Sequence, residues 1–149
     1  MAGFLAIDWN VHGLRVVEGH LKGHHLHLGG GLGLAIPFDP AQAESLGANL
    51  KAQMQAAGIK PAPVVFTVSR DVLLSRDVRH PDVPENEVPA IVQFQTFKEL
   101  AVAPDDVVLD HQPLSLLWPT GEKRSLALLL RRPQLAAYER LCQAAGLKL

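Results

Sequence analysis

The order of strand-like and helix-like segments is the feature that most restricts how this chain can fold. Three short segments in which apolar and polar residues alternate come before the first segment with helical spacing, and helices and strands alternate afterwards. The predicted strands are residues 4–7, 14–18, 25–28, 64–68, 73–78, 107–110 and 125–130, and the predicted helices are residues 40–57, 85–100 and 133–145. This βββ-α-ββ-α-ββ-α order predicts an α/β fold.

Composition and charge narrow the range of functions. The chain of 149 residues is 48% hydrophobic and has a net charge of −1 at pH 7, which is typical of a folded, soluble domain. A balanced charge gives no long-range attraction to nucleic acid or anionic lipid, so we expect no nucleic-acid partner and no direct binding to a membrane surface. The apolar runs are far shorter than the roughly 20 residues of a membrane-spanning helix. Residues 1–4 lack the features of a secretory signal, and we therefore expect a cytoplasmic protein.

Local signals predict how the helices begin and end. The pair Asp39-Pro40 is typical of a helix start, whereas Gly58 and Gly146 can adopt the positive φ that ends many helices. Pro89 is compatible with a helix only in its first turn, where a missing N–H loses no bond inside the helix. The single cysteine, Cys142, cannot form an internal disulfide, and we expect it to be packed and unreactive.

A group of histidines lies in the hairpin predicted for the second and third strands. If Lys22 and Gly23 form the loop, one face carries Val17, Leu21, Leu26 and Leu28 and the other carries Glu18, His20, His25 and His27. This arrangement predicts a hairpin with one buried face. Neighbouring side chains on one face of a hairpin lie roughly 5–7 Å apart, so His20, His25 and His27 are the candidate metal ligands. A solvent-facing polar hairpin gives the same pattern, and we expect no metal site.

Six short stretches together carry a resemblance to a known family. They are residues 7–15 (IDWNVHGLR), 57–60 (AGIK), 65–68 (VFTV), 81–88 (PDVPENEV), 105–112 (DDVVLDHQ) and 144–147 (AAGL). In this order and at this spacing they resemble the PilM/GspL-like family of type IV pilus assembly and type II secretion, which has the fold of actin-like ATPases. The resemblance covers essentially the whole chain.

The resemblance implies a domain organisation. It implies an RNase H-like or actin-like ATPase N-terminal region, with a βββ-α opening and a mixed sheet, followed by an inserted α+β subdomain similar to subdomain 1C of the family. Residues 1–70 correspond to the first half of subdomain 1A, and residues 71–149 to the 1C-like segment. Proteins of this family continue for about twice this length. We therefore expect an N-terminal portion, and its open sheet edge predicts self-association.

The resemblance also implies a nucleotide-phosphate loop after the first strand. Its counterparts here are Asp8, Asn10, His12, Gly13 and Arg15. The family's turn is rich in Gly and Ser, which lets backbone N–H groups approach a phosphate, whereas this turn contains Trp9, Asn10 and Val11. We interpret the loop as degenerate and expect no catalytic residue and no cofactor, since ATP with Mg²⁺ would require residues of a longer protein. The alternatives are the N-terminal lobe of an active ATPase or phosphotransferase, and an RNase H-like nuclease that uses Asp8.

The preferred interpretation is a non-catalytic cytoplasmic scaffold of an inner-membrane assembly platform. In the family, PilM holds a short cytoplasmic peptide of the membrane protein PilN between subdomains 1A and 1C, which implies a PilN-like partner and a place peripheral to the inner membrane. The residues that correspond to this groove are Val65, Thr67, Val88, Ile91, Val92 and Gln95. Trp9 and Trp118 lie at predicted turns, where they either anchor a partner or cover an edge of the core, and we favour the core.

Overall fold

The structure, a computed structural model, describes residues 2–114 and 122–149. It divides into two compact units: unit 1 comprises Met1–Ser69 with Pro133–Leu149, and unit 2 comprises Arg70–Arg132. The first crossing from one unit to the other coincides with the boundary predicted near residue 70. The prediction differs for residues 133–149, which belong to unit 1 and not to the 1C-like segment.

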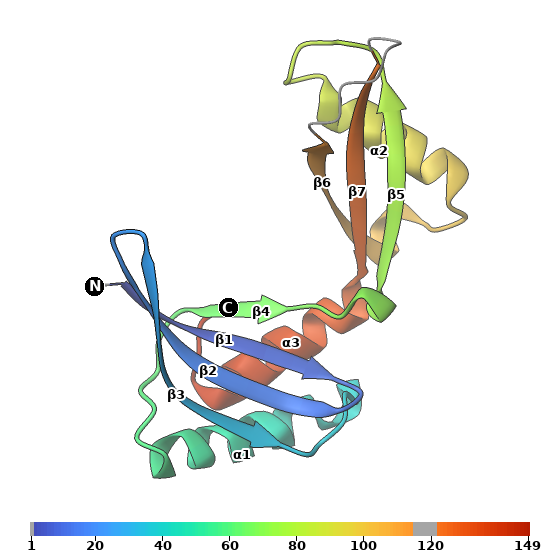
Figure 1. Ribbon diagram of the computed structural model, residues 1–149. Coiled ribbons are helices and arrows are strands. Elements are labelled where there is room, and N and C mark those ends of the chain that lie inside the picture. Colours follow the sequence, from blue (N-terminus) through green and yellow to red (C-terminus); the bar gives the residue numbers. More distant parts are fainter. Residues whose placement is uncertain (1, 115–121) are drawn as a thin grey trace. The chain divides into compact units, whose positions relative to one another are not determined.

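Unit 1 is built on a four-stranded mixed sheet that has helices on one face (Figure 1). Strands β1 (Ala2–Asn10), β2 (Gly13–Lys22) and β3 (His25–Leu34) form an antiparallel meander, and β4 (Val64–Thr67) pairs parallel to β1, which gives the order β3-β2-β1-β4. Leu5, Ile7 and Trp9 are buried on the side of helices α1 (Ala43–Ala56) and α3 (Arg132–Ala145). The predicted βββ-α opening and mixed sheet are therefore confirmed.

Helix α3 belongs to unit 1 because its apolar face packs there. Gly47 of α1 lies against the backbone of α3, and a Cβ at this position would be 2.4 Å from the carbonyl oxygen of Leu141. Tyr138, Leu141 and Cys142 are all buried. The family resemblance grouped residues 133–149 with the preceding strands, whereas the burial of this apolar face places them in unit 1.

The two long helices of unit 1 end as predicted. Gly58 and Gly146 both have a φ of +71°. The N–H of the residue after each glycine bonds back to a helix carbonyl, at 2.9 Å and 2.8 Å, so both helices close with the same local motif. Before α1, Asp39 caps a short 3-10 turn, η1 (Pro40–Gln42), by accepting the N–H of Ala41 at 3.0 Å.

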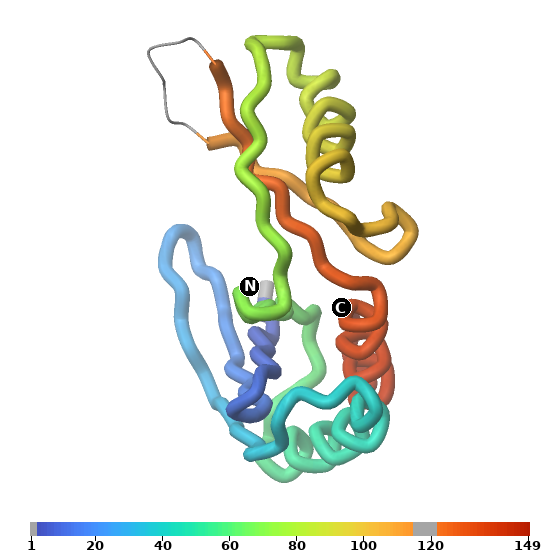
Figure 2. The backbone as a smooth tube through the Cα atoms, turned by 90° about the vertical axis from the view of Figure 1, so that its right-hand side faces the viewer, coloured from blue at the N-terminus to red at the C-terminus, as the bar shows by residue number. Residues whose placement is uncertain are grey.

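The hairpin of β2 and β3 differs from its prediction in two ways. Its loop is Gly23 and His24, because His25 pairs with Lys22; Gly23 has a φ of +62°, and the expected loop would have put a lysine at the position that needs this angle. The leucines and histidines do lie on opposite faces. However, residues 20–31 are exposed on both faces, so the expected buried face is wrong. Figure 2 shows the reason, since the hairpin tip reaches past the start of β1.

Unit 2 is an antiparallel sheet with helix α2 packed on it. Its elements are η2 (Arg70–Val72), β5 (Leu73–His80), α2 (Val88–Glu99), η3 (Pro104–Asp106), β6 (Val107–Leu114) and β7 (Lys123–Arg131), with the strand order β5-β7-β6. Helix α2 begins three residues later than predicted. A start at residue 85 would have placed Pro89 in the second turn, where it would remove a helix hydrogen bond. Val78, Val88, Val92 and Ala127 form a buried apolar cluster of this unit, and Val107 and Leu129 are buried as well.

Candidate functional site

The turn after β1 gathers several predicted phosphate-loop residues around one carboxylate. Asp8 Oδ2 accepts the Nδ2–H of Asn10 at 2.8 Å and lies 3.5 Å from Nη1 of Arg15, its cross-strand partner. Asp8 Oδ1 accepts the hydroxyl of Thr67 at 3.3 Å. Thr67 reaches Asp8 because β1 and β4 run parallel and pair at these two residues. We call Asp8, Asn10, Arg15 and Thr67 the Asp8 cluster.

The backbone of the same turn is already engaged within the protein. The N–H of His12 donates to Asn10 Oδ1 at 2.8 Å. Gly13 opens β2 with a φ of +129°, and a Cβ there would lie 2.4 Å from the carbonyl oxygen of Leu34. The glycine at this position therefore serves the close approach of β3. An N–H that a phosphate loop would offer to its ligand is here satisfied by an asparagine side chain.

A row of aromatic rings fills the core of unit 1. The ring centroids are 4.6 Å apart for Trp9 and Phe38, 5.4 Å for Phe38 and Tyr138, and 4.3 Å for Tyr138 and Phe66. The indole N–H of Trp9 donates to the carbonyl of Ile36 at 3.1 Å, and the side chain is buried. Trp9 is therefore a core residue, as favoured from the sequence, and is not a partner anchor.

Two ionisable groups on α3 are held in their neutral forms. Burial, and secondarily the charge of Asp8, raises the pKa of the Tyr138 hydroxyl above its ordinary value. Burial raises the pKa of the Cys142 thiol to about 11. Neither group can serve as a nucleophile or base near neutral pH, which agrees with the packed, unreactive cysteine expected from the sequence.

The six residues predicted to line a partner groove are divided between the two units. In unit 1, Val65 and Thr67 are exposed on β4, which is an edge strand. In unit 2, Val88 and Val92 are part of the buried core, so their side chains are not accessible to a partner. Ile91 and Gln95 are the half-buried members of the set on α2.

An exposed aromatic residue on α2, Phe94, was not included in the predicted partner groove. Phe94 is 69% exposed, and the residues one turn before and after it, Ile91 and Phe97, are half-buried. We call these three residues the α2 stripe. Their spacing of three residues places them beside the core face, and from the sequence the positions of Phe94 and Phe97 predict that this helix contacts more than one neighbour. Trp118 and the turn predicted at residues 119–121 lie outside the described residues.

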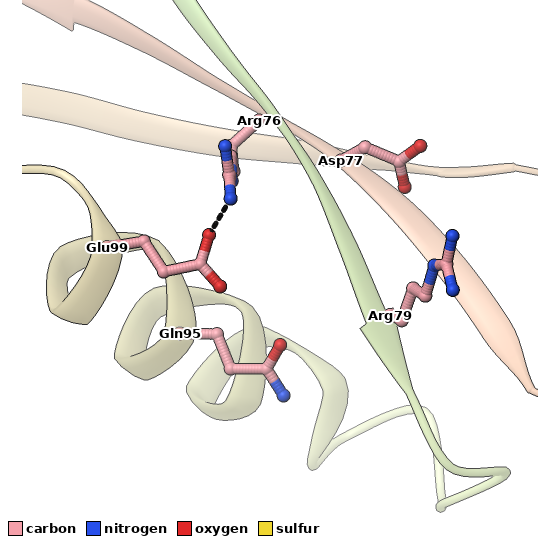
Figure 3. Close-up of a pocket in the computed structure, with 5 residues that line it drawn as sticks. All are labelled: Arg76, Asp77, Arg79, Gln95 and Glu99. Atoms are coloured by element: carbon pink, nitrogen blue, oxygen red, sulfur yellow. Dashed lines mark ion pairs between the residues drawn. The ribbon is translucent and has the colours of Figure 1, made fainter.

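Unit 2 also has a shallow polar pocket of about 350 Å³ between α2 and β5. Figure 3 shows Arg76 directed toward Glu99, with which it forms an ion pair, and Gln95 on the same helix. Asp77 and Arg79 complete the lining. Two arginines and two carboxylates balance one another, so the pocket presents no excess charge to a ligand.

Two groups that contain histidine resemble functional sites but form neither a catalytic pair nor a metal site in the part of the chain that the structure describes. His80 Nε2 lies 3.1 Å from Ser125 Oγ and His80 Nδ1 lies 2.9 Å from the carbonyl of Pro81, but His80 and Ser125 are both buried, so no substrate can reach the pair. In the hairpin, His20 faces His27, whereas His25 faces Lys22. Over residues 2–114 and 122–149, no three metal-binding side chains come close enough to share an ion.

The βββ-α opening, the mixed sheet and the second unit placed between Ser69 and Pro133 define a class: the chain has an actin-like ATPase-related fold. No protein-family model and no curated protein matches the sequence. Among solved structures, the chain is similar to one described as the PilM-PilN type IV pilus biogenesis complex, with 22% identity and a TM-score of 0.81 over 97% of this chain and 45% of that one.

A second similar structure comes from a secretion machine. It is the cytoplasmic domain of EpsL, an inner-membrane component of the type II secretion system of Vibrio cholerae, with 15% identity and a TM-score of 0.56 over 99% of this chain and 56% of that one. The chain thus spans about half the length of both structures. The resemblance to the PilM/GspL-like family is confirmed at the level of the fold. None of the helices that the structure describes combines the length and hydropathy needed to cross a bilayer.

Proposed function

We propose that this chain is a non-catalytic cytoplasmic scaffold module of a type IV pilus or type II secretion-like assembly platform. Its task is to bind a short cytoplasmic peptide of a PilN-like membrane protein, which would hold it at the inner membrane. The observation that carries the proposal is the likeness of 97% of the chain to a structure described as a PilM-PilN complex.

Each unit offers an apolar surface suited to an extended peptide. In unit 1, Val65 is 55% exposed on the edge strand β4, where a peptide can add main-chain hydrogen bonds. In unit 2, the α2 stripe presents Phe94 between Ile91 and Phe97, and aromatic residues dominate binding energy at many interfaces. We therefore replace the buried Val88 and Val92 with Phe94 in the proposed contact set.

The proposal includes no nucleotide cofactor. Asp8 already accepts bonds from Asn10 and Thr67, and the N–H of His12 is satisfied by Asn10. A phosphate would have to displace these contacts at the turn. This supports a scaffold over the ATPase and nuclease alternatives, both of which need Asp8 free to hold a metal or phosphate.

Calorimetric titration of the chain with a synthetic N-terminal cytoplasmic peptide of a PilN-like protein tests the proposal, with Mg-ATP as a parallel titrant. We expect saturable peptide binding and no heat from Mg-ATP. The variant Phe94→Ala is expected to weaken peptide binding at least about tenfold. Gln93→Ala, an exposed neighbour on the same helix, is the matched control and should bind as the wild type does.

The outcomes separate the candidates. Tight binding of Mg-ATP would overturn the degenerate-loop interpretation, and absence of peptide binding would overturn the scaffold proposal. Equal binding by the wild type and Phe94→Ala would remove the α2 stripe from the site. We further propose that the chain self-associates, because β3 and β4 leave both edges of the sheet in unit 1 unpaired along most of their length.

A further inference from the structure

The sheet of unit 1 has a second face, opposite to α1 and α3, that is apolar and open to solvent. Leu21, Leu26 and Leu28 are between 52% and 70% exposed there, and Val65 is 55% exposed. Phe4 and Val17 are half-buried on the same side. We call these six residues the outer face. Exposed apolar surface gathered in this way marks an interaction site more often than an inert surface.

The strand register places these side chains in adjacent rows. Leu21 pairs with Leu26, and Leu28 pairs with Gly19, which in turn pairs with Phe4. The ring of Phe4 lies over Gly19, where an added Cβ would be 2.4 Å from it. Glycine in the middle strand therefore lets an aromatic ring lie flat between the leucines and the centre of the sheet, and the surface is continuous across β3, β2 and β1.

The next row is apolar and small. Ala6 pairs with Val17 on one side and with Val65 on the other, and Val17 pairs with Gly31. Because the side chains of this row are short, the surface is flat, and a flat apolar surface can pack face to face against another sheet. In addition, residues 4–7 of β1 are apolar on both faces of the strand, a pattern typical of strands that are covered on both sides.

The charge of the outer face favours a second copy as the occupant. Its one polar row contains Asp8 paired with Arg15, which cancel each other. Lys22 and the paired His20 and His27 point to the opposite face of the hairpin. Two copies of this face therefore meet without like charges opposing one another, and a charged partner would gain nothing from it.

The size of the face is also compatible with a weak dimer. Strands β2 and β3 have 10 residues each. At about 3.3 Å per residue and about 4.8 Å between strands, the whole outer side of β1, β2 and β3, including its polar row, covers roughly 500 Å², so two copies would bury about 1,000 Å². This value reaches the lower end of specific protein interfaces.

We infer that a second copy of this chain packs its outer face against the same outer face, sheet on sheet. The inference deepens the self-association proposed above by naming its surface. Val65 belongs both to this surface and to the proposed peptide site, but the test below measures self-association without the peptide. It differs from pairing at the strand edges, which would leave the leucines exposed.

Sedimentation velocity of the full chain from micromolar to millimolar concentration tests the inference. The variant carrying Leu26→Glu and Leu28→Glu introduces two charges into the outer face and should weaken dimerisation at least about tenfold. The matched control carries His25→Glu and His27→Glu, the same change in the same strand on the opposite face, and should dimerise like the wild type. Circular dichroism verifies that both variants remain folded.

Each result is decisive. A wild-type dimer that persists in Leu26→Glu, Leu28→Glu would overturn the outer face as the interface and leave edge pairing as the basis of self-association. Equal loss in both variants would also overturn it. A wild-type monomer at every concentration would overturn self-association itself and assign the outer face to a different occupant, while the peptide titration would stand on its own.

Discussion

The two units of this chain differ in the size of the side chains that they bury between sheet and helix. Unit 1 buries large side chains, among them Trp9, Tyr138 and Leu5, between its sheet and two helices. Unit 2 has a buried cluster of three valines and one alanine beneath a single helix. Because stabilisation grows with the apolar area removed from water, the comparison predicts that unit 1 is the robust part and unit 2 the part that opens first.

The interior of unit 2 also contains three buried polar residues, whereas unit 1 has one buried side-chain oxygen without a partner, that of Gln134. His80, Thr96 and Ser125 are buried in unit 2, and the hydroxyl of Thr96 has no hydrogen-bond partner. A buried polar atom without a partner costs free energy. Burying polar residues in place of apolar ones yields less stabilisation, which agrees with the expectation that unit 2 opens first.

The strongest test of the comparison removes the largest core side chain of unit 1. Trp9→Ala should lower the free energy of unfolding by about 3–5 kcal/mol, because it leaves a cavity and removes the bond to the Ile36 carbonyl. Unfolding in urea, followed by circular dichroism, measures this change. Val11→Ala is the control, since Val11 is exposed, and its effect should be within about 0.5 kcal/mol. Similar losses in both variants would contradict the description of Trp9 as a core residue.

A smaller effect is expected for the core of unit 2. Val92→Ala removes two buried methyl groups and should cost about 2 kcal/mol. Amide hydrogen exchange should accelerate in β5 and β7 and stay unchanged in β1, because the two units have separate cores. Phe94→Ala on the same helix is the control and should leave exchange unchanged. Equal acceleration of exchange in β1 would mean that the two units open together, and it would contradict the expectation that unit 2 opens first.

The smallest effect concerns Cys142 and depends on pH. Because the pKa of this thiol is raised to about 11 from 9.0, the folded state favours the protonated form. Its contribution to stability is therefore fully present below pH 9 and is lost as the pH rises toward 11. Near pH 8, alkylation by iodoacetamide should be slow in the folded protein and fast in urea. Rapid alkylation of the folded chain would show that unit 1 opens more readily than this comparison allows.

The sequence was sufficient where a local signal determines the structure. Gly58 and Gly146 end their helices because the residue after the last turn needs a positive φ. A glycine directly after a helical segment is a signal that a short stretch of sequence contains. The order of strands and helices was predicted for the same reason, since each segment carries its own periodicity. The exception is the hairpin loop. Gly23 can be either the first or the second residue of a two-residue loop, and only the pairing of the full strands shows that it is the first.

The sequence was insufficient where residues far apart meet. The bond between the Thr67 hydroxyl and Asp8 was not predicted, because it depends on the parallel pairing of two strands that are separated by α1. Val88 and Val92 were assigned to the partner groove, and they are core residues because their face of α2 meets the sheet. Helical spacing identifies an apolar face but not whether a sheet or a partner covers it.

The division of unit 1 into two separate stretches of sequence has a consequence for how the protein is made. A ribosome completes all of unit 2 before it adds α3, which closes the core of unit 1 around Tyr138 and Leu141. Unit 2 can therefore fold during synthesis from contacts that are close in sequence, whereas β1 to β4 must wait for the last helix. During this interval, Trp9, Phe38 and Phe66 lack the cover of Tyr138, and the nascent chain is most exposed to aggregation.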